Sequence, residues 1–371
     1  MIFINAQILD GDFRLRKADI EIDDERIVRL ADTLSYTEHD LVVDCAGYTI
    51  VPGFVDIHVH GGAGADTCDA DAQGLREMAK FLLTKGVTSF CPTTMTVSNE
   101  EIAKSLETVR SCMADKDGAR IVGVNLEGPF ISPAKKGAQG DEFTQAPDYD
   151  VFKALYDGCG GIIKLVDIAP ECDVKGGFIE KASKLCTVSV AHTATGYEGA
   201  KAAFQAGATH ATHLFNAMSG MTHRAPGVVG AVFDTDTVRG ELICDGIHIH
   251  PAVVRTVFTL MPRRVCVVSD AMRLSGMEDG GQGMLGVNLV TVKDGKATLE
   301  DGTIAGSVTN LHDELKNLVS WGIPLEKAVR AMTLTPAEAI GMEKEIGSIA
   351  VGKRADLVVL DENLEIVAVY H

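Results

Sequence analysis

Short apolar segments alternate with segments of helical periodicity through the middle of the chain. Apolar residues recur every three or four positions over residues 72–86, 99–113 and 197–207, a spacing that predicts amphipathic helices. The apolar runs between such segments predict strands within residues 54–60, 87–95, 120–130, 161–171, 187–194, 210–218, 240–248 and 264–272. Eight strands alternating with helices indicate an α/β fold of the (β/α)₈ TIM-type barrel class. The alternative, an open doubly wound sheet, lacks a glycine-rich dinucleotide turn after its first strand.

Both ends of the chain have a different texture. Residues 1–50 contain short β segments broken by glycine, aspartate and charged turns, and the last 25 or so residues, "GSIAVGKRADLVVLDENLEIVAVYH", have the same β-rich pattern. The stretch near 284–304 carries "KDG" and "EDG" turns and predicts a hairpin excursion.

Composition narrows the possible functions. The 371 residues carry a net charge of −18, which makes nucleic acid an unexpected partner. Nine cysteines lie scattered without a C-x-x-C pair, which argues against a disulfide framework. No apolar run reaches membrane-spanning length, and the N-terminus lacks the features of an export signal, so we expect a cytoplasmic enzyme with no membrane partner.

The first barrel strand contains an unusual pair of histidines. In "VPGFVDIHVHGG", His58 and His60 are two residues apart and therefore share one face of an extended strand. A buried imidazole needs a hydrogen bond or a metal ion to offset its lost hydration. The pair is interpreted as metal ligands, and the alternative is two core histidines bonded to backbone groups.

Further polar residues end other predicted strands. In a (β/α)₈ barrel the C-terminal strand ends meet at one mouth, where catalytic groups lie. Imidazole together with carboxylate suits Zn²⁺, with Fe²⁺ as the alternative. Residues at the predicted rim, besides the first-strand pair, are Glu127, His192, His213, His248 and Asp270. His210 begins its strand and is interpreted as a structural hydrogen-bonder, and His39, His312 and His371 as surface or supporting residues.

Asp270, in "VVSDAM", is assigned a role separate from the ligands. A carboxylate beside metal-activated water can take its proton and later deliver it to a leaving group. The alternative is a carboxylate that only orients a histidine.

The loop after His213, "HLFNAMSGMTHRAPG", carries groups able to hold a polar ligand. Asn216 offers an amide, Ala217 a backbone donor, and His223 with Arg224 a cationic pair. An arginine fork suits phosphate or carboxylate, although a solvated loop arginine is an equally good interpretation of spacing alone.

Together, these motifs resemble the N-acetylglucosamine-6-phosphate deacetylase family of the amidohydrolase superfamily. The matching stretches occur in the family's order through nearly the whole chain: "PGFVDIHVHG", "LEGPF", "KKGA", "AHTAT", "THLFNAM", "RAPG", "DGIH", "SDAM" and "AGS". The resemblance implies a metal-dependent barrel over residues 52–345 and a small β-sandwich domain formed by residues 1–51 and 346–371. It also implies hydrolysis of the acetamide of N-acetyl-D-glucosamine 6-phosphate, in amino-sugar catabolism, to glucosamine 6-phosphate and acetate.

The resemblance assigns roles to particular residues. Glu127, His192 and His213 match the family's principal metal ligands, and Asp270 matches its general acid/base. It implies a homodimer in which His223 and Arg224 bind the 6-phosphate across the interface. Residues that match substrate contacts are Ala138, Gln139, Asn216, Ala217, His223, Arg224, His248, Ile304, Ala305 and Gly306. Where many members have a histidine near the acetamide carbonyl, this chain has Gln139, which can donate a hydrogen bond but carries no positive charge.

Alternatives concern the number of metal ions, the sugar and the reaction. His58 and His60 predict a second, weaker metal site beside one tight site, with Glu127 shared between them. The sugar's C4 preference is not readable, so N-acetylgalactosamine 6-phosphate is an alternative substrate. Another amidohydrolase activity, hydrolysis of a cyclic amide or deamination of a base, would use the same rim. A non-catalytic sugar-phosphate sensor is the alternative of a different class.

Overall fold

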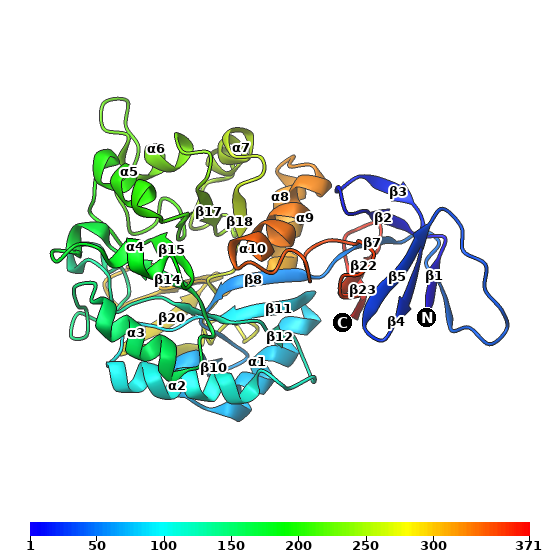
Figure 1. Cartoon of the computed structure of the whole chain (residues 1–371), viewed down its shortest axis with the longest axis horizontal. Coiled ribbons are helices and arrows are strands. Elements are labelled where there is room, and N and C mark those ends of the chain that lie inside the picture. Colours follow the sequence, from blue (N-terminus) through cyan, green and yellow to red (C-terminus); the bar gives the residue numbers. More distant parts are fainter.

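A ring of short parallel strands forms the centre of the computed structural model, which describes residues 1–371 (Figure 1). All eight predicted strands are confirmed, and the third is interrupted into two pieces. The strands are β8 (Phe54–Val59), β11 (Val87–Pro92), β12 (Arg120–Ile121), β13 (Val124–Leu126), β14 (Ile163–Ile168), β15 (Thr187–Val190), β16 (His210–Ala211), β17 (Arg239–Leu242) and β18 (Val265–Val267).

These strands pair in the order in which they occur along the chain. One sheet runs β8–β11–β12 and the other runs from β13 through β18, with every pair parallel. Single parallel bridges connect the two sheets, Thr93 with Asn125 on one side and Val59 with Ala271 on the other. This cyclic order is that of a (β/α)₈ barrel.

The helices lie around these strands (Figure 1). Their order is α1 (Ala72–Thr84), α2 (Asn99–Cys112), α3 (Tyr149–Gly158), α4 (Phe178–Ala182), α5 (Tyr197–Ala206), α6 (Gly227–Phe233), α7 (Pro251–Leu260), α8 (Leu311–Ser320), α9 (Leu325–Met332) and α10 (Leu334–Ala339). The three segments predicted from periodicity are confirmed as α1, α2 and α5. Local signals fix their starts: Asp71 caps α1, and Ser98 and Glu101 form a capping box at α2.

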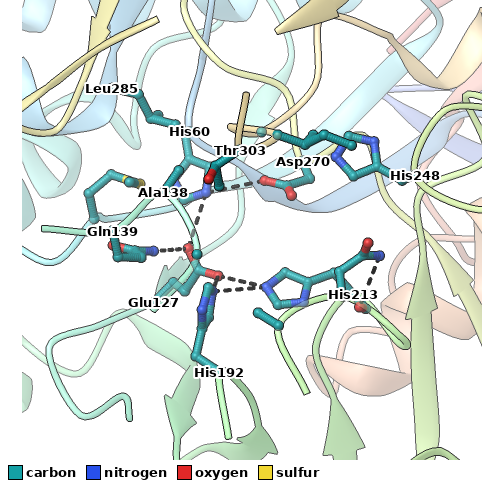
Figure 2. Close-up of a pocket in the computed structure, with 16 residues that line it drawn as sticks. His60, Glu127, Ala138, Gln139, His192, His213, His248, Asp270, Leu285 and Thr303 are labelled. Atoms are coloured by element: carbon teal, nitrogen blue, oxygen red, sulfur yellow. Dashed lines mark hydrogen bonds and ion pairs between the residues drawn. The ribbon is translucent and has the colours of Figure 1, made fainter. Parts of the chain in front are cut away.

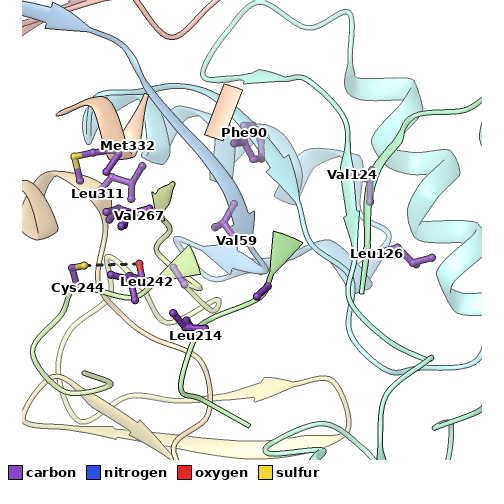
Figure 3. Packing of buried hydrophobic residues seen from close by; sticks show 14 of the residues in the cluster. Val59, Phe90, Val124, Leu126, Leu214, Leu242, Cys244, Val267, Leu311 and Met332 are labelled. Carbon is purple, nitrogen blue, oxygen red and sulfur yellow. Dashed lines mark hydrogen bonds between the residues drawn. The ribbon is translucent and has the colours of Figure 1, made fainter. Parts of the chain in front are cut away.

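The barrel core is made of side chains from the strands and from the inner faces of the helices. Figure 3 shows Val59, Phe90 and Leu242 from strands near Leu311 and Met332 from helices, and all five are buried. Each such side chain contributes roughly 1.5–3 kcal/mol by leaving water. The rigid core therefore holds the strand ends, and the side chains that follow them, at fixed positions.

The two chain ends form a pair of smaller sheets beside the barrel, where both termini lie (Figure 1). One sheet contains β1 (Ile2–Ile4), β4 (Asp19–Asp23), β5 (Arg26–Ala31) and β6 (Val42–Asp44). The other contains β2 (Gln7–Leu9), β3 (Leu15–Lys17), β7 (Thr49–Pro52), β22 (Leu357–Leu360) and β23 (Ile366–Tyr370). Antiparallel pairing of β22 with β7 joins the C-terminal segment to the N-terminal one.

The excursion expected near residues 284–304 is larger than a hairpin. It is a three-stranded antiparallel sheet of β19 (Gln282–Leu285), β20 (Asn288–Lys293) and β21 (Lys296–Thr298), because the segment before Leu285 also pairs with β20. Asn288 donates a hydrogen bond of 2.8 Å to the carbonyl of Ala138, which ties this sheet to the loop after β13. A two-stranded ribbon, β9 (Gly61–Gly62) and β10 (Ala65–Asp66), follows β8. None of the helices combines the length and the apolar character needed to cross a membrane.

Candidate metal centre and active site

The polar residues predicted at the rim converge on one point beyond the strand ends (Figure 2). His58 belongs to β8 and His60 follows it, while Glu127 comes directly after β13. His192 and His213 each lie two residues beyond a strand, β15 and β16, and Asp270 lies three beyond β18. All are buried. Residues up to 212 positions apart in the chain therefore share one site because parallel strands of a barrel end on one side.

Glu127 is the centre of this cluster. Its Oε1 lies 3.0 Å from Nε2 of His192 and 3.1 Å from Nε2 of His213. Its Oε2 lies 3.2 Å from Nε2 of His60, and Oε1 lies 3.7 Å from Nε2 of His58. The carboxylate thus belongs to two groups able to hold a metal ion, one with His192 and His213 and one with His58 and His60.

The histidine nitrogens that face this carboxylate have the donor set of a metal site. Nδ1 of His192 lies 2.8 Å from the carbonyl oxygen of Lys135. Because a carbonyl oxygen can only accept a hydrogen bond, Nδ1 carries the proton and Nε2 keeps a lone pair. Nε2 of His192 and of His213 are only 3.1 Å apart, and Nε2 of His58 and of His60 are 3.3 Å apart. Imidazole nitrogens facing one another around a buried carboxylate fit a divalent cation between them.

Protons bind strongly to the two first-strand histidines, His58 and His60, when no metal competes with them. Burial lowers the pKa of His60, but hydrogen bonds to Asp270 and Glu127 and their negative charge outweigh it and raise the pKa to about 10. For His58, burial also lowers the pKa, and the charges of Glu241, Asp270 and Glu127 raise it well above its ordinary value. The site therefore attracts positive charge.

Asp270 lies at the edge of the cluster, against the first-strand histidines. Its Oδ1 is 3.3 Å from Nε2 of His60 and 3.6 Å from Nε2 of His58. Burial raises the pKa of this carboxyl, but the adjacent charges of His58 and His60 lower it below its usual value. Asp270 is therefore ionised at neutral pH and able to accept a proton.

Backbone conformation aims three of these side chains. His192, His213 and Asp270 have φ values of 41°, 30° and 46°, in the left-handed region that non-glycine residues seldom adopt. Such conformations persist where the surrounding structure enforces them, and they are common at functional sites. Each produces a sharp turn as the chain leaves its strand.

Gln139 is held in one orientation next to Glu127. Its Oε1 accepts a 2.7 Å hydrogen bond from the backbone N–H of Thr96, so its Nε2 must point the other way, where it donates to Oε2 of Glu127 at 2.7 Å. One of the two amide hydrogens is thus committed to the carboxylate.

A pocket of about 290 Å³ opens over the cluster, a size suited to a small molecule. Most of its lining was predicted from sequence: His60, Glu127, Ala138, Gln139, His192, His213, Asn216, Ala217, His248, Asp270, Ile304 and Gly306. Met95, Gly137, Leu285 and Thr303 complete the lining and were not predicted. Met95 and Leu285 give one wall an apolar surface.

Four predicted residues do not line the pocket of the single chain: His58, Ala305, His223 and Arg224. Ala305 is buried behind its neighbours Ile304 and Gly306. His223 and Arg224 lie exposed on the loop before α6, where Nη1 of Arg224 is 2.7 Å from Nε2 of His223. No arginine or lysine lines the pocket.

Two carboxylates that were not predicted from the sequence support the site. Asp245 Oδ2 lies 2.7 Å from Nδ1 of His248; burial lowers the pKa of that histidine, and Asp245 raises it by more. Glu241, inside β17, lies 2.9 Å from Nδ1 of His58 and 3.1 Å from Nε2 of His210, which places His210 in the structural role predicted for it. The available signal was a charged residue within an apolar strand, in "GELICDGIH". His312 is buried rather than superficial and bonds the carbonyl of Leu364 at 2.7 Å.

Comparison with known proteins gives consistent relatives. Residues 49–370 match the amidohydrolase family. The N-acetylglucosamine-6-phosphate deacetylase of Bacillus subtilis is 36% identical over 87% of this chain and 83% of its own length. The N-acetylgalactosamine-6-phosphate deacetylase of Escherichia coli O157:H7 is 32% identical, over 90% and 87%.

Solved structures agree over the whole chain. The N-acetylglucosamine-6-phosphate deacetylase of Pasteurella multocida has a TM-score of 0.93 and 29% identity, covering 100% of this chain and 97% of that one. The enzyme of Mycobacterium smegmatis, as an aspartate-to-alanine variant in complex with N-acetyl-D-glucosamine 6-phosphate, has a TM-score of 0.90 and 32% identity, with coverage of 100% and 97%.

Proposed function

The chain belongs to the amidohydrolase family, and from that membership we propose that it hydrolyses the acetamide of N-acetyl-D-glucosamine 6-phosphate. The products are glucosamine 6-phosphate and acetate, a step of amino-sugar catabolism. The relatives named above support the substrate class. The observation that carries the proposal is Glu127 lying between two pairs of histidines, with Asp270 beside them, beneath a pocket of small-molecule size.

The metal positions follow from the two groups that share Glu127. Glu127, His192 and His213 would hold the tighter metal, and His58 and His60 would hold a weaker second one with the shared carboxylate. Three of these five ligands would serve each ion, and the mixture of imidazole and carboxylate favours Zn²⁺, with Fe²⁺ as the alternative. A metal bound here supplies acidification of water and polarisation of the acetamide carbonyl.

The protein's own groups handle the protons. Asp270 accepts a proton from the water whose oxygen adds to the acetamide carbonyl carbon. When the C–N bond breaks, Asp270 delivers that proton to the departing nitrogen, which leaves as the amine of glucosamine 6-phosphate. Gln139 keeps one amide hydrogen free of Glu127, and this hydrogen is assigned to the carbonyl oxygen as negative charge develops there.

The remaining pocket residues position the sugar. Asn216 and His248 offer polar side chains, and Ala217 and Ile304 offer backbone groups beside them. The 6-phosphate needs cationic partners, and the pocket of one chain has no arginine or lysine. We assign that role to His223 and Arg224 of a second copy in a homodimer, since both are exposed and free to reach outward.

The finer organisation of the chain is also part of the proposal. Residues 52–345 form the catalytic barrel, and residues 1–51 with 346–371 form a small β-sandwich. In support, both terminal sheets contribute to one hydrophobic cluster, with Phe3 and Ile20 from one sheet and Ile8 and Leu357 from the other. We place the enzyme in the cytoplasm, in keeping with nine cysteines that are all unpaired.

A substrate comparison tests the proposed function. The purified protein is incubated with N-acetylglucosamine 6-phosphate, its galactosamine epimer, unphosphorylated N-acetylglucosamine and a cyclic amide, and acetate and free amine are measured. The expected order has the glucosamine phosphate first. Faster turnover of the galactosamine epimer would move the assignment to that relative's substrate, turnover of the cyclic amide alone would indicate a cyclic amidase, and binding without turnover would indicate a sensor.

Metal stoichiometry tests the two positions. Gently prepared protein is expected to contain more than one equivalent of metal per chain, falling toward one after brief chelation, because the shared Glu127 lies closer to His192 and His213 than to His58 and His60. His58→Ala combined with His60→Ala is expected to remove the weaker metal and keep the tighter one. His39→Ala, at an exposed histidine far from the cluster in sequence, is the control. Unchanged stoichiometry and activity in the double variant would make the pair structural.

A further inference from the structure

Glu241 is a fully buried carboxylate that touches both metal-ligand groups without reaching the pocket. Its Oε2 accepts from the backbone N–H of His213 at 3.1 Å and lies 2.9 Å from Nδ1 of His58. Its Oε1 lies 3.1 Å from Nε2 of His210. It does not line the substrate pocket, so it has no access to the acetamide.

The contact with Glu241 determines which nitrogen of His58 is free. A carboxylate accepts hydrogen bonds, so Nδ1 of His58 must carry the hydrogen, and the lone pair of Nε2 then faces His60 and Glu127. His60 is held more weakly, by a 3.3 Å contact from its Nδ1 to the carbonyl of Thr93. Glu241 is therefore the charged residue that orients the first-strand pair of histidines.

The charge of Glu241 is a second, independent observation that links this residue to a metal position. No lysine or arginine contacts Glu241, although its carboxylate is fully buried, and its partners are two imidazoles and one backbone N–H. A buried carboxylate is costly unless positive charge lies nearby, and without a metal only a protonated imidazole can supply that charge here. A divalent ion held by His58 would offset that cost, and Glu241 would in turn raise the electron density that His58 offers to the metal.

We propose that Glu241 is a positioning residue that sets the affinity of the second metal position by holding His58 as its Nδ1–H tautomer. This inference rests on the proposed pair of metal positions, and it goes beyond them by naming a residue that binds neither metal nor substrate. Glu241 holds the weaker metal through the side chain of His58. Its bond to His213 is to the backbone, so the ring that serves the tighter metal keeps its lone pair without it.

Zn²⁺ titration of the metal-depleted full-length protein in a competing chelator measures the two affinities separately. Glu241→Gln keeps the size of the side chain and removes its charge. It is expected to weaken binding of the second equivalent about 10–100-fold and to leave the first within a few-fold. Glu314→Gln is the matched control, because Glu314 is equally buried and accepts from the backbone N–H of Cys244 at 3.0 Å, with no ligand histidine in contact.

Two further variants complete the test. Glu241→Asp keeps the charge and withdraws it by one methylene, so it is expected to weaken binding of the second equivalent less than Glu241→Gln does. It takes the place of the glutamine variant if that variant does not fold. Adding Glu241→Gln to His58→Ala is expected to cause no further loss. Unchanged affinity for the second equivalent in the glutamine variant, or an equal loss of both equivalents, would overturn the proposal. Because no substrate is used, failure of the deacetylase assignment would be seen separately, in the acetate assay.

Discussion

Asp270→Asn is expected to lower kcat for N-acetylglucosamine 6-phosphate about a thousandfold while leaving the metal content of the protein unchanged. The asparagine side chain has nearly the same shape as that of aspartate. It can still lie against His60, whose Nε2 is 3.3 Å from Oδ1 of Asp270. It cannot accept the proton of the attacking water or return it to the amine. Steady-state rates and metal analysis of the same preparation measure the two effects.

Asp167→Asn is the matched control for this substitution. Asp167 is fully buried and accepts from the hydroxyl of Thr212 at 2.9 Å, but it does not line the pocket. Burial raises the pKa of its carboxyl well above the usual value, helped by the charges of Glu127 and Glu241, so its surroundings favour the neutral form. An amide should therefore replace it with little loss of rate. Near-normal turnover in Asp270→Asn would remove Asp270 from the mechanism.

Arg224→Ala is expected to raise KM for the phosphorylated sugar about a hundredfold, and to change KM for unphosphorylated N-acetylglucosamine little. A charge-assisted contact from a guanidinium to phosphate contributes a few kcal/mol, and a hundredfold change in affinity corresponds to about 2.7 kcal/mol. The partly exposed Lys136, which pairs with Asp141 on the loop beside the pocket, gives the control variant Lys136→Ala.

Mixed dimers test whether the arginine is shared. A dimer of one Arg224→Ala subunit and one Asp270→Asn subunit contains one site with an intact Asp270 and a neighbour's intact Arg224. Activity at a low concentration of the phosphorylated sugar should therefore reappear when the two impaired preparations are mixed and exchange subunits. Absence of recovery in verified mixed dimers would indicate that each site uses its own arginine.

The site residues best predicted from the sequence are those whose position follows from the strand that they end or follow. His58, Glu127, His192 and Asp270 each follow or end an apolar run, and barrel geometry alone brings such positions together. The same reasoning predicted the pocket loop at Asn216. These inferences needed only the side-chain periodicity of a strand and the common direction of parallel strand ends.

Contacts between distant strands could not be predicted in the same way. Glu241 lies 183 residues from His58, and nothing in "GELICDGIH" indicates which imidazole it contacts. The orientation of Gln139 depends on the backbone N–H of Thr96, 43 residues earlier. The sequence could therefore suggest that the Gln139 amide is a hydrogen-bond donor, but not that one of its hydrogens is donated to Glu127. The first strand of the excursion, β19, was not predicted because Gln282 and Gly283 lack an alternating pattern.

The most direct test of the account is metal-dependent release of acetate from N-acetylglucosamine 6-phosphate by the wild-type protein and by Glu127→Ala. Both are stripped of metal, Zn²⁺ is added back in steps, and acetate and free amine are quantified together. Because Glu127 lies between both pairs of histidines, we expect equimolar acetate and amine from the wild type, lost on stripping and restored by Zn²⁺, with no restoration in the variant. Acetate release that survives stripping, or that returns fully in Glu127→Ala, would contradict it.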